Sequence, residues 1–323
     1  MPYWCHILLV HLTVAGRLVA DMAITLNDTF FCESFIIIIM TIQLKNQRGI
    51  FFVPDGTEIK EALARVTHLA IGAHPDDIEF MAWHGILEGL ADKGKFFAGV
   101  TATDGGGSSR IGAYADVTDE EMRLIRLQEQ KKAAYLGNYA ALASLGYTSA
   151  QVREQKREDV KADLKNIIKA ARPQVIFTHN LADRHKTHLA VVLLVIEALR
   201  ELGEEYYPQE FYGGEVWRSL DWLPLSERRA FDVGQRPNLN NALMELYDSQ
   251  ISGGKNYHLA TRGRREANAT YADAYAPDEA SMLELFMDLH PLLEQPQLSP
   301  AAYLSGLIDK FKAETLANLA SLT

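Results

Sequence analysis

Residues 67–73 read Thr-His-Leu-Ala-Ile-Gly-Ala, and residues 74–79 continue as His-Pro-Asp-Asp-Ile-Glu. The first seven residues form a short, largely apolar run that stops at a His-Pro step, as a buried strand of a parallel sheet does. Apolar residues at helical spacing precede this run in residues 59–66. The pattern predicts a helix, then a buried strand, then a polar loop rich in ionisable groups.

The same alternation continues along the chain. Further buried strands are predicted at residues 96–103 and 174–178, and helices at about 119–136, 160–171 and 186–202. Thr118 begins the first of these helices, because Thr118 and Glu121 have the spacing of a capping box. Strands that alternate with helices in this way predict an α/β fold, a three-layer Rossmann-like sandwich with a mostly parallel central sheet.

The composition is that of a globular protein. The chain has 323 residues, of which 48% are hydrophobic and 23% are charged, so it can bury a large core, and disorder is excluded. Its 42 acidic and 32 basic residues give a net charge of −10, which disfavours nucleic acid and anionic membranes as partners. No stretch reaches the roughly 20 apolar residues of a membrane-spanning helix. We expect a cytoplasmic protein that acts on a small molecule, with homo-oligomer formation left open.

Residues 1–39 differ in character from the rest of the chain. They hold both cysteines, Cys5 and Cys32, which are too few for a cysteine-rich zinc site, so histidines and carboxylates must hold any metal. The first basic residue, Arg17, follows the first apolar run, unlike in a secretory signal. We predict that residues 1–39 are a non-core extension and that residues 40–323 form a single α/β domain. The alternative is a strand or helix within the extension that caps the domain.

Two loops concentrate the ionisable side chains. In α/β sheets ligands bind at the carboxyl ends of the strands, so the loops after the first and third predicted strands are where chemistry is expected. Residues 74–79 bring one histidine and three carboxylates, and residues 179–188 bring three histidines and one aspartate. Either loop alone could simply cap a helix or carry surface side chains. Both loops together, at adjoining strand ends, favour a functional site.

The residue types in these loops suit a metal. Pro75 is expected to open a helix at its first position, where Asp76 and Asp77 diverge by about 100 degrees and so take different tasks. One can bind a metal and the other can face a bound water. His185 and His188 lie three residues apart on one helical face. Two histidines and a carboxylate leave positions open for water and substrate, as catalytic zinc requires.

The two loops carry a resemblance to a known family. Residues 73–79 (AHPDDIE) and 183–188 (DRHKTH) resemble the two signature motifs of the zinc-dependent PIG-L or LmbE-like de-N-acetylases. The similarity extends over residues 66–200 and includes Arg-Leu-Gln-Glu at 126–129. The resemblance implies that the chain uses Zn²⁺ to remove an acetyl group from an N-acetylated amino sugar, glycoconjugate or related amide, giving acetate and a free amine.

The resemblance also implies a role for each motif residue. His74, Asp77 and His188 would hold the zinc ion. Asp76 would be the general base that takes a proton from water. His185 would stabilise the oxyanion or act as an acid.

Three further expectations come from comparing this chain with the family pattern. Arg126 becomes a candidate for substrate binding. Many members have aspartate in the place of Thr187, so Asp183 is expected to orient an imidazole instead. His84 stands where members often have glycine and could reach toward the site, although a lone histidine on a helix more often packs or meets solvent.

Two other segments could contact the substrate. Residues 104–110 (DGGGSSR) lack the ending of a phosphate loop, but Asp104 and Arg110 could contact sugar hydroxyls; the alternative is a flexible surface turn. Residues 253–265 gather basic and aromatic groups, including His258, and suggest a substrate lid, with a solvated basic turn as the alternative. We expect residues 203–323 to add this lid and C-terminal helical elements.

Two other functions remain open on the sequence alone. One is a non-catalytic, Rossmann-like carbohydrate-binding protein that keeps the fold without the chemistry. The other is a metal-dependent phosphoesterase, for which a second cluster of metal ligands is expected and is not obvious in the sequence.

Overall fold

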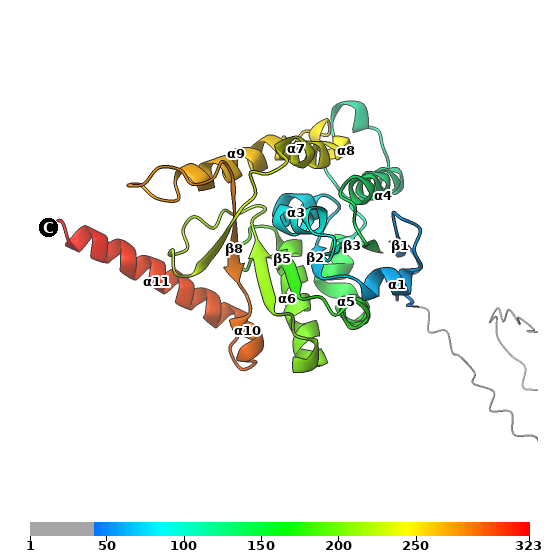
Figure 1. Cartoon of the computed structure of the whole chain (residues 1–323). Coiled ribbons are helices and arrows are strands. Elements are labelled where there is room, and N and C mark those ends of the chain that lie inside the picture. Colours follow the sequence, from blue (N-terminus) through cyan, green and yellow to red (C-terminus); the bar gives the residue numbers. More distant parts are fainter. Residues whose placement is uncertain (1–41) are drawn as a thin grey trace, which may run out of the picture. The chain divides into compact units, whose positions relative to one another are not determined.

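A mixed sheet runs through residues 42–323, the part of the chain that this computed structural model describes (Figure 1). The predicted extension at residues 1–39 lies outside the described residues. The strands are β1 (Ile50–Phe52), β2 (His68–Gly72), β3 (Phe97–Thr103), β4 (Ala141–Tyr147), β5 (Val175–His179), β6 (Glu210–Gly214), β7 (Arg228–Asp232) and β8 (Leu283–Asp288). They lie in the order β1-β4-β3-β2-β5-β6-β8-β7.

The centre of the sheet is parallel and its two edges are antiparallel. Strands β4, β3, β2, β5 and β6 run in the same direction, whereas β1 pairs antiparallel with β4, and β8 pairs antiparallel with both β6 and β7. Strands β2 and β5 are direct neighbours, with His68 opposite Val175. The loops that follow these two strands therefore emerge side by side.

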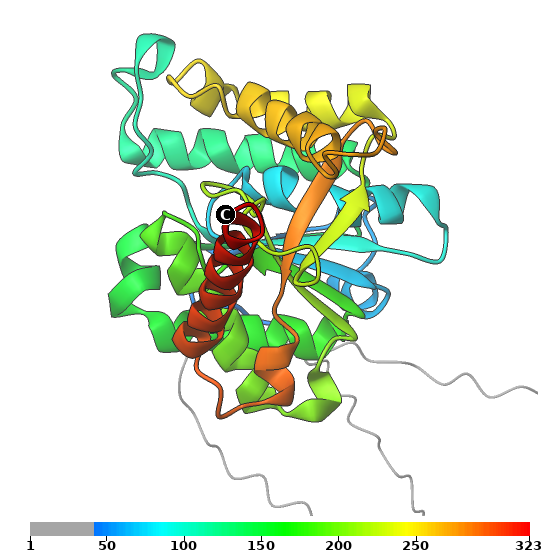
Figure 2. The same ribbon diagram turned by 90° about the vertical axis from the view of Figure 1, so that its left-hand side faces the viewer.

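Helices cover both faces of the sheet (Figure 2). One face carries α1 (Ile59–Ala64), α5 (Arg157–Ala171), α6 (Lys186–Leu202) and α10 (Pro291–Glu294). The other carries α2 (Asp77–Met81), α3 (Trp83–Ala91), α4 (Asp119–Leu136) and α7 (Pro237–Glu245). Beyond these lie α8 (Asp248–Ile251), α9 (Tyr257–Thr270) and α11 (Pro300–Ala320). No helix within the described range combines the length and apolar character needed to cross a bilayer.

Each face of the sheet has its own apolar core. In β2, Leu69 and Ile71 belong to one core and Ala70 to the other, because successive side chains of a strand point to opposite faces. A strand covered on both faces is apolar throughout, which is why the run at 67–73 shows no polar alternation. The three-layer sandwich with a mostly parallel sheet is confirmed.

The strands and helices named from the sequence are confirmed, whereas strands β1, β4, β6, β7 and β8 had no predicted range. Strand β4 was missed, because its Ala-Leu-Ala-Ser-Leu-Gly-Tyr sequence has few of the β-branched and aromatic residues that favour strands. The prediction that Pro75 opens a helix is wrong. Helix α2 begins at Asp77, because Asp76 has φ 100° and ψ −33°, which is not a helical conformation.

The capping box at Thr118 is confirmed. The Thr118 hydroxyl accepts a hydrogen bond from the Glu121 backbone N–H (3.3 Å), and the Glu121 carboxylate accepts one from the Thr118 N–H (2.9 Å). On the same side of the sheet, the His84 ring stacks on Phe231 with centroids 3.9 Å apart. His84 therefore packs, as the more frequent behaviour of a lone histidine suggests.

A buried ion pair joins helix α9 to the antiparallel edge of the sheet. Arg265 Nη2 lies 2.6 Å from Glu284 Oε1, and both side chains are 2% exposed. We expect Arg265→Met to lower the free energy of unfolding by about 3–5 kcal/mol, because it leaves the Glu284 carboxylate buried without its partner. Denaturant unfolding measures the effect. The matched control is Arg262→Met on the same helix, which breaks the exposed pair with Glu266 and should cost under about 1 kcal/mol.

Candidate active site

The loop after β2 turns the side chain of Asp77 back toward His74. The Asp77 carboxylate accepts a hydrogen bond from the His74 backbone N–H (2.6 Å), and the same oxygen, Oδ2, lies 3.2 Å from His74 Nδ1. Asp77 is 3% exposed. The carboxylate and the imidazole are therefore held together at the carboxyl end of β2.

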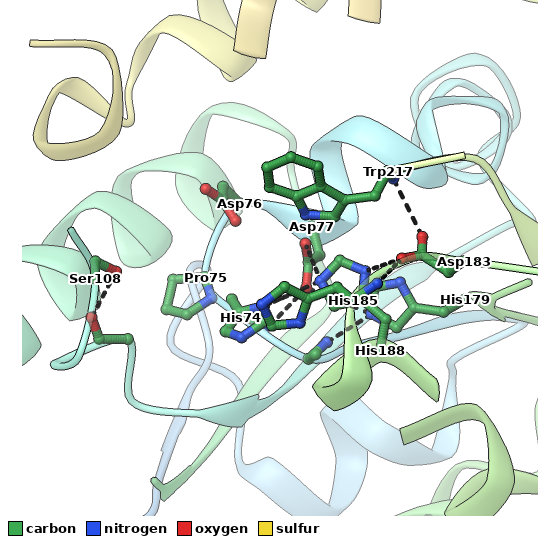
Figure 3. Close-up of polar contacts among 12 residues, drawn as sticks. His74, Pro75, Asp76, Asp77, Ser108, His179, Asp183, His185, His188 and Trp217 are labelled. Atoms are coloured by element: carbon green, nitrogen blue, oxygen red, sulfur yellow. Dashed lines mark hydrogen bonds and ion pairs between the residues drawn. The ribbon is translucent and has the colours of Figure 1, made fainter. Parts of the chain in front are cut away.

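Three imidazoles come from the neighbouring strand β5 and its following helix (Figure 3). His179 is the last residue of β5, His185 directly precedes α6, and His188 lies in the first turn of α6. The His188 ring stacks against that of His179, with centroids 3.9 Å apart, and lies 4.6 Å from that of His185. His188 Nε2 reaches across to 3.2 Å from His74 Nδ1.

The three residues expected to bind metal have donor atoms at ligand spacing. His74 Nδ1 lies 3.2 Å from both Asp77 Oδ2 and His188 Nε2, and His188 Nε2 lies 3.4 Å from Asp77 Oδ1. Ligands about 2.1 Å from a tetrahedral zinc ion stand roughly 3.4 Å apart, so each of these distances fits, with Asp77 approaching the two histidines through different carboxylate oxygens. The side chains also form two overlapping groups of possible metal ligands, His74-His185-His188 and Asp77-His179-His188. The donor set of imidazoles and one carboxylate suits zinc.

The protonation of these groups favours metal binding. Burial would raise the pKa of Asp77, but the imidazoles of His188, His179 and His74 outweigh burial and hold it well below its usual value. Burial lowers the pKa of His188 to about 3. At neutral pH Asp77 is therefore a carboxylate and His188 a neutral imidazole, the forms in which both residues bind metals.

Asp76 has different surroundings from Asp77 (Figure 3). Its Oδ2 lies 2.8 Å from Arg126 Nη2, and both side chains are buried. Burial raises the pKa of Asp76 well above its usual value, although the Arg126 guanidinium opposes the effect and the charge of Asp77 adds to it. A carboxylate with a raised pKa is better suited to accept and hold a proton.

A chain of buried hydrogen bonds fixes the unusual backbone of Asp76. Its N–H donates to Gln130 Oε1 (3.1 Å), and Gln130 Nε2 donates to the Glu79 carboxylate (3.0 Å). Glu79 also accepts the hydroxyls of Tyr139 (2.6 Å) and Tyr247 (2.7 Å). A non-glycine residue at positive φ is strained and persists only where its surroundings hold it. Residues from α2, α4 and the segment before α8 supply that support.

We expect Gln130→Met to weaken this support without touching the residues expected to bind metal. The variant leaves the Asp76 N–H buried without an acceptor, which costs about 1–3 kcal/mol of stability. Turnover should fall while zinc content stays at the wild-type level. The measurements are Tm, zinc content and kcat. Lys132→Met, at an exposed position of the same helix, is the control; an equal loss of kcat in both variants would remove Gln130 from this role.

Asp183 contacts both histidines of the second motif and the backbone of Trp217. Its Oδ1 accepts a hydrogen bond from the His185 backbone N–H (2.8 Å) and lies 3.3 Å from His188 Nδ1. Its Oδ2 accepts one from the Trp217 N–H (3.1 Å). The imidazole of His188 holds the pKa of Asp183 below its usual value against the effect of burial. Asp183 thus contacts the Nδ1 atom of His188, while the Nε2 atom of the same ring faces His74 and Asp77.

A cavity of about 710 Å³ opens over these groups. Among the residues expected to contact substrate, Arg126 and Asp104 line it. Arg110 is not among the lining residues: its guanidinium donates to the carbonyls of Gly106 and Val117 and to the Asp119 carboxylate, all near its own loop. It holds that loop together.

The segment expected to form a lid contributes other residues than His258. Tyr257, the first residue of α9, lines the cavity together with Lys255, whereas His258 does not. Trp217 lines the cavity as well, 37% exposed, with its ring nearly parallel to that of His185. Nothing in the sequence favoured Tyr257 over its neighbour His258, because a shift of one residue along a helix moves a side chain to a different side.

Comparison with known proteins identifies the family. The family model "PIG-L: GlcNAc-PI de-N-acetylase" matches residues 69–199. The "Uncharacterized deacetylase YaiS" of Escherichia coli K12 is 31% identical to this chain over 155 residues, which are 46% of this chain and 77% of YaiS. The chain belongs to the PIG-L family. Both loops that carried the resemblance, residues 74–79 and 183–188, fall within the matched range.

Solved structures share the fold of this PIG-L family member. N,N'-diacetylchitobiose deacetylase from Pyrococcus horikoshii is 18% identical, with a TM-score of 0.56, over 71% of this chain and 85% of that one. GalB, the 4-carboxy-2-hydroxymuconate hydratase from Pseudomonas putida KT2440, is also 18% identical, with a TM-score of 0.53, over 69% of this chain and 96% of that one. One is named a deacetylase and the other a hydratase, so the fold alone does not decide the reaction.

Proposed function

We propose that this PIG-L family member is a zinc-dependent N-deacetylase that releases acetate and a free amine from an N-acetylated amino sugar, glycoconjugate or related amide. The observation that carries the proposal is the close approach of donor atoms from His74, Asp77 and His188. His74 Nδ1 lies 3.2 Å from His188 Nε2, and the two carboxylate oxygens of Asp77 lie 3.2 Å from His74 Nδ1 and 3.4 Å from His188 Nε2. Asp76 lies next to Asp77 in sequence but pairs with Arg126 instead. The two aspartates can therefore have different roles in the reaction.

His74, Asp77 and His188 would hold the zinc ion. Three protein ligands leave coordination positions for water and for the substrate carbonyl. When bound, zinc supplies a Lewis acid that polarises a carbonyl and lets water lose a proton near neutral pH.

Asp76 is the group that takes the proton from water. Its raised pKa lets it keep that proton long enough to pass it on, and its pairing with Arg126 fixes the direction of the carboxylate. Arg126 lines the substrate cavity and pairs with Asp76, so we assign it to positioning this base as well as to substrate contact.

His185 faces the developing oxyanion. It lines the cavity, and burial lowers its pKa, so at neutral pH it is an uncharged imidazole that still carries one N–H. That N–H can donate to an oxygen that gains charge during the attack. Trp217, beside His185, offers a ring face on which a sugar can stack.

A substrate panel tests the proposal. The zinc-loaded protein is incubated with N-acetyl amino sugars and with sugar phosphates, and the release of free amine, acetate and inorganic phosphate is measured. Amine and acetate in equal amounts are expected. Phosphate release alone would favour the phosphoesterase. Sugar binding without release of any product would favour the carbohydrate-binding protein, as would a chain that binds no zinc.

The structure bears on the phosphoesterase alternative. Phosphoesterases often use two metal ions about 3.5–4 Å apart, which requires two sets of ligands. Among residues 42–323, the two groups of possible ligands share His188 and lie at the same strand ends. They suit one metal ion rather than two, which favours hydrolysis of an amide.

A further inference from the structure

The substrate cavity extends well beyond the possible zinc ligands. His185 follows β5 and His74 follows β2, whereas residues 105–109 follow β3 and residues 148–153 follow β4, and all of these segments contribute to the lining. The strands lie in the order β4-β3-β2-β5. Adjacent strands are about 4.8 Å apart, so the end of β4 lies about 10 Å from the end of β2. The cavity is thus long enough for more than an N-acetyl group and its ring.

Arg153 lines the far end of this cavity. It belongs to a single π-helical turn, Gln151–Gln155, which follows β4. The side chain is partly buried, and its Nε atom is fully buried without a hydrogen-bond partner among residues 42–323. A guanidinium has five N–H donors and is always charged, and the Nε–H of Arg153 is one donor that stays buried without an acceptor unless a ligand supplies an oxygen atom.

The other charges at this end of the cavity are already balanced. Arg48 pairs with Glu120 (3.3 Å), and Arg126 pairs with Asp76. Burial raises the pKa of Asp104, but the positive charges of Arg123 and Arg48 oppose this effect, so Asp104 has cationic neighbours of its own. Arg153 forms no ion pair with any carboxylate of the described residues. Lys255 also lines the cavity and forms no ion pair among residues 42–323, but its Nζ lies over the Trp217 ring. Arg153 is therefore the cation that follows β4 and remains for a ligand.

Hydroxyl groups line the cavity in the segments that follow β3 and β4. Thr148 and Ser149 directly precede the π-helical turn, and Ser109 follows β3, whereas the Ser108 hydroxyl already donates to the Gly105 carbonyl (2.8 Å). Serine and threonine hydroxyls donate to oxygen ligands, and an arginine can hold a carboxylate or a phosphate with two parallel hydrogen bonds. The lining at this end suits an oxyanion better than an apolar group.

We propose that Arg153 is a specificity-determining residue, which binds an oxyanion of the substrate at the end of the cavity over β4. The substrate would be an N-acetylated amine that carries a carboxylate or a phosphate about 10 Å from its acetamide. This inference rests on the proposed deacetylase function and adds to it the chemical class of the substrate.

Three glycosides of N-acetylglucosamine test the subsite, because they differ only at the end of the aglycone. The 5-carboxypentyl and 5-phosphonopentyl glycosides carry an anion at the end of an aglycone long enough to reach the proposed subsite, and the 5-carbamoylpentyl glycoside is the uncharged isostere of the first. We expect kcat/KM of the zinc-loaded protein to be about 10- to 100-fold higher for an anionic glycoside than for the neutral one, mainly through KM. The anion preferred, carboxylate or phosphonate, identifies the group on the natural substrate.

Substitutions assign the preference to Arg153. Arg153→Met should reduce the anionic-to-neutral ratio of kcat/KM to about one, and Arg153→Lys should restore part of it. Arg157→Met is the matched control, because Arg157 lies in the next helix, pairs with Glu197 and does not line the cavity. A structural role of Arg153 would lower the rates for all three glycosides alike and leave the ratio unchanged.

The results distinguish an incorrect assignment of the anion subsite from an incorrect assignment of the deacetylase function. Equal kcat/KM for all three glycosides, or a preference that survives Arg153→Met, would overturn the subsite while the deacetylase function stands. If none of the glycosides is deacetylated, calorimetric Kd values still test the subsite. Tighter binding of the anionic glycosides to the wild type, lost in Arg153→Met, would then support it, and equal binding would overturn it.

Discussion

Replacing His188 with alanine is expected to remove the bound zinc and essentially all turnover. His188 is the donor that belongs to both groups of possible ligands, and its Nε2 lies within 3.4 Å of donor atoms from His74 and Asp77. Loss of one of three protein ligands leaves too few to hold the ion. The measurements are zinc per chain by elemental analysis and kcat/KM on one N-acetyl sugar, with Tm to confirm folding.

Two further variants sharpen this test. His290→Ala removes a histidine that pairs with Glu294 far along the chain and should change neither zinc content nor rate. His179→Ala should also keep zinc, because His179 Nε2 accepts the Ala73 backbone N–H (2.9 Å) and so has no lone pair to offer there. A His188→Ala variant that binds zinc like the wild type would refute the proposed ligand set. Zinc loss in His179→Ala would place that residue among the ligands.

The sequence predicted the part of the site that depends on strand order. Residues 74–79 and 179–188 each follow an apolar run, and parallel strands end at the same edge of a sheet, so the two loops had to meet once β2 and β5 were neighbours. His179 was counted with the second loop but received no role, because its place at the last position of β5, beside Asp77 and His188, shows only in the structure.

The parts that were missed depend on contacts between distant residues. Asp76 holds its positive φ through Gln130, 54 residues later, and Glu79 receives a hydroxyl from Tyr247, 168 residues later. No local pattern marks such partners. Pro75 and Asp76 together have the pattern of a helix start, and only the packed structure prevents it. Residues 203–323 thus support the site as well as lining its cavity.

Contacts between distant residues also explain why Arg153, and not Arg110, is a candidate for binding a ligand. Both follow strands of the parallel centre, and only Arg110 stands in a glycine-rich segment that suggests ligand binding. The guanidinium of Arg110 holds its own loop, whereas the Nε atom of Arg153 has no hydrogen-bond partner within residues 42–323. An arginine remains for a ligand only where no carbonyl or carboxylate oxygen lies near enough to bind it. The sequence alone does not say which oxygens lie near which arginine.

Asp76→Asn is expected to keep its zinc and to lose about 10²–10⁴-fold in kcat, because the amide cannot take a proton from water. Asn has nearly the same shape and leaves the Arg126 guanidinium an oxygen to bind, whereas alanine would leave that buried charge without a partner. The loss should appear equally in kcat and kcat/KM, since the proton is transferred only in the transition state.

Asp77→Asn supplies the comparison that separates the two neighbouring carboxylates. Asp77 lies within 3.4 Å of donor atoms from two imidazoles, and Asp76 contacts Arg126 instead, so only the Asp77 variant should lose both zinc and turnover. Elemental analysis and kcat on one N-acetyl sugar are measured for both variants, with Tm as the check of folding. Zinc loss in Asp76→Asn with retention in Asp77→Asn would reverse the two assignments. Full activity in Asp76→Asn would mean that another group takes the proton, and the raised pKa of Asp76 would then reflect only its burial beside Asp77.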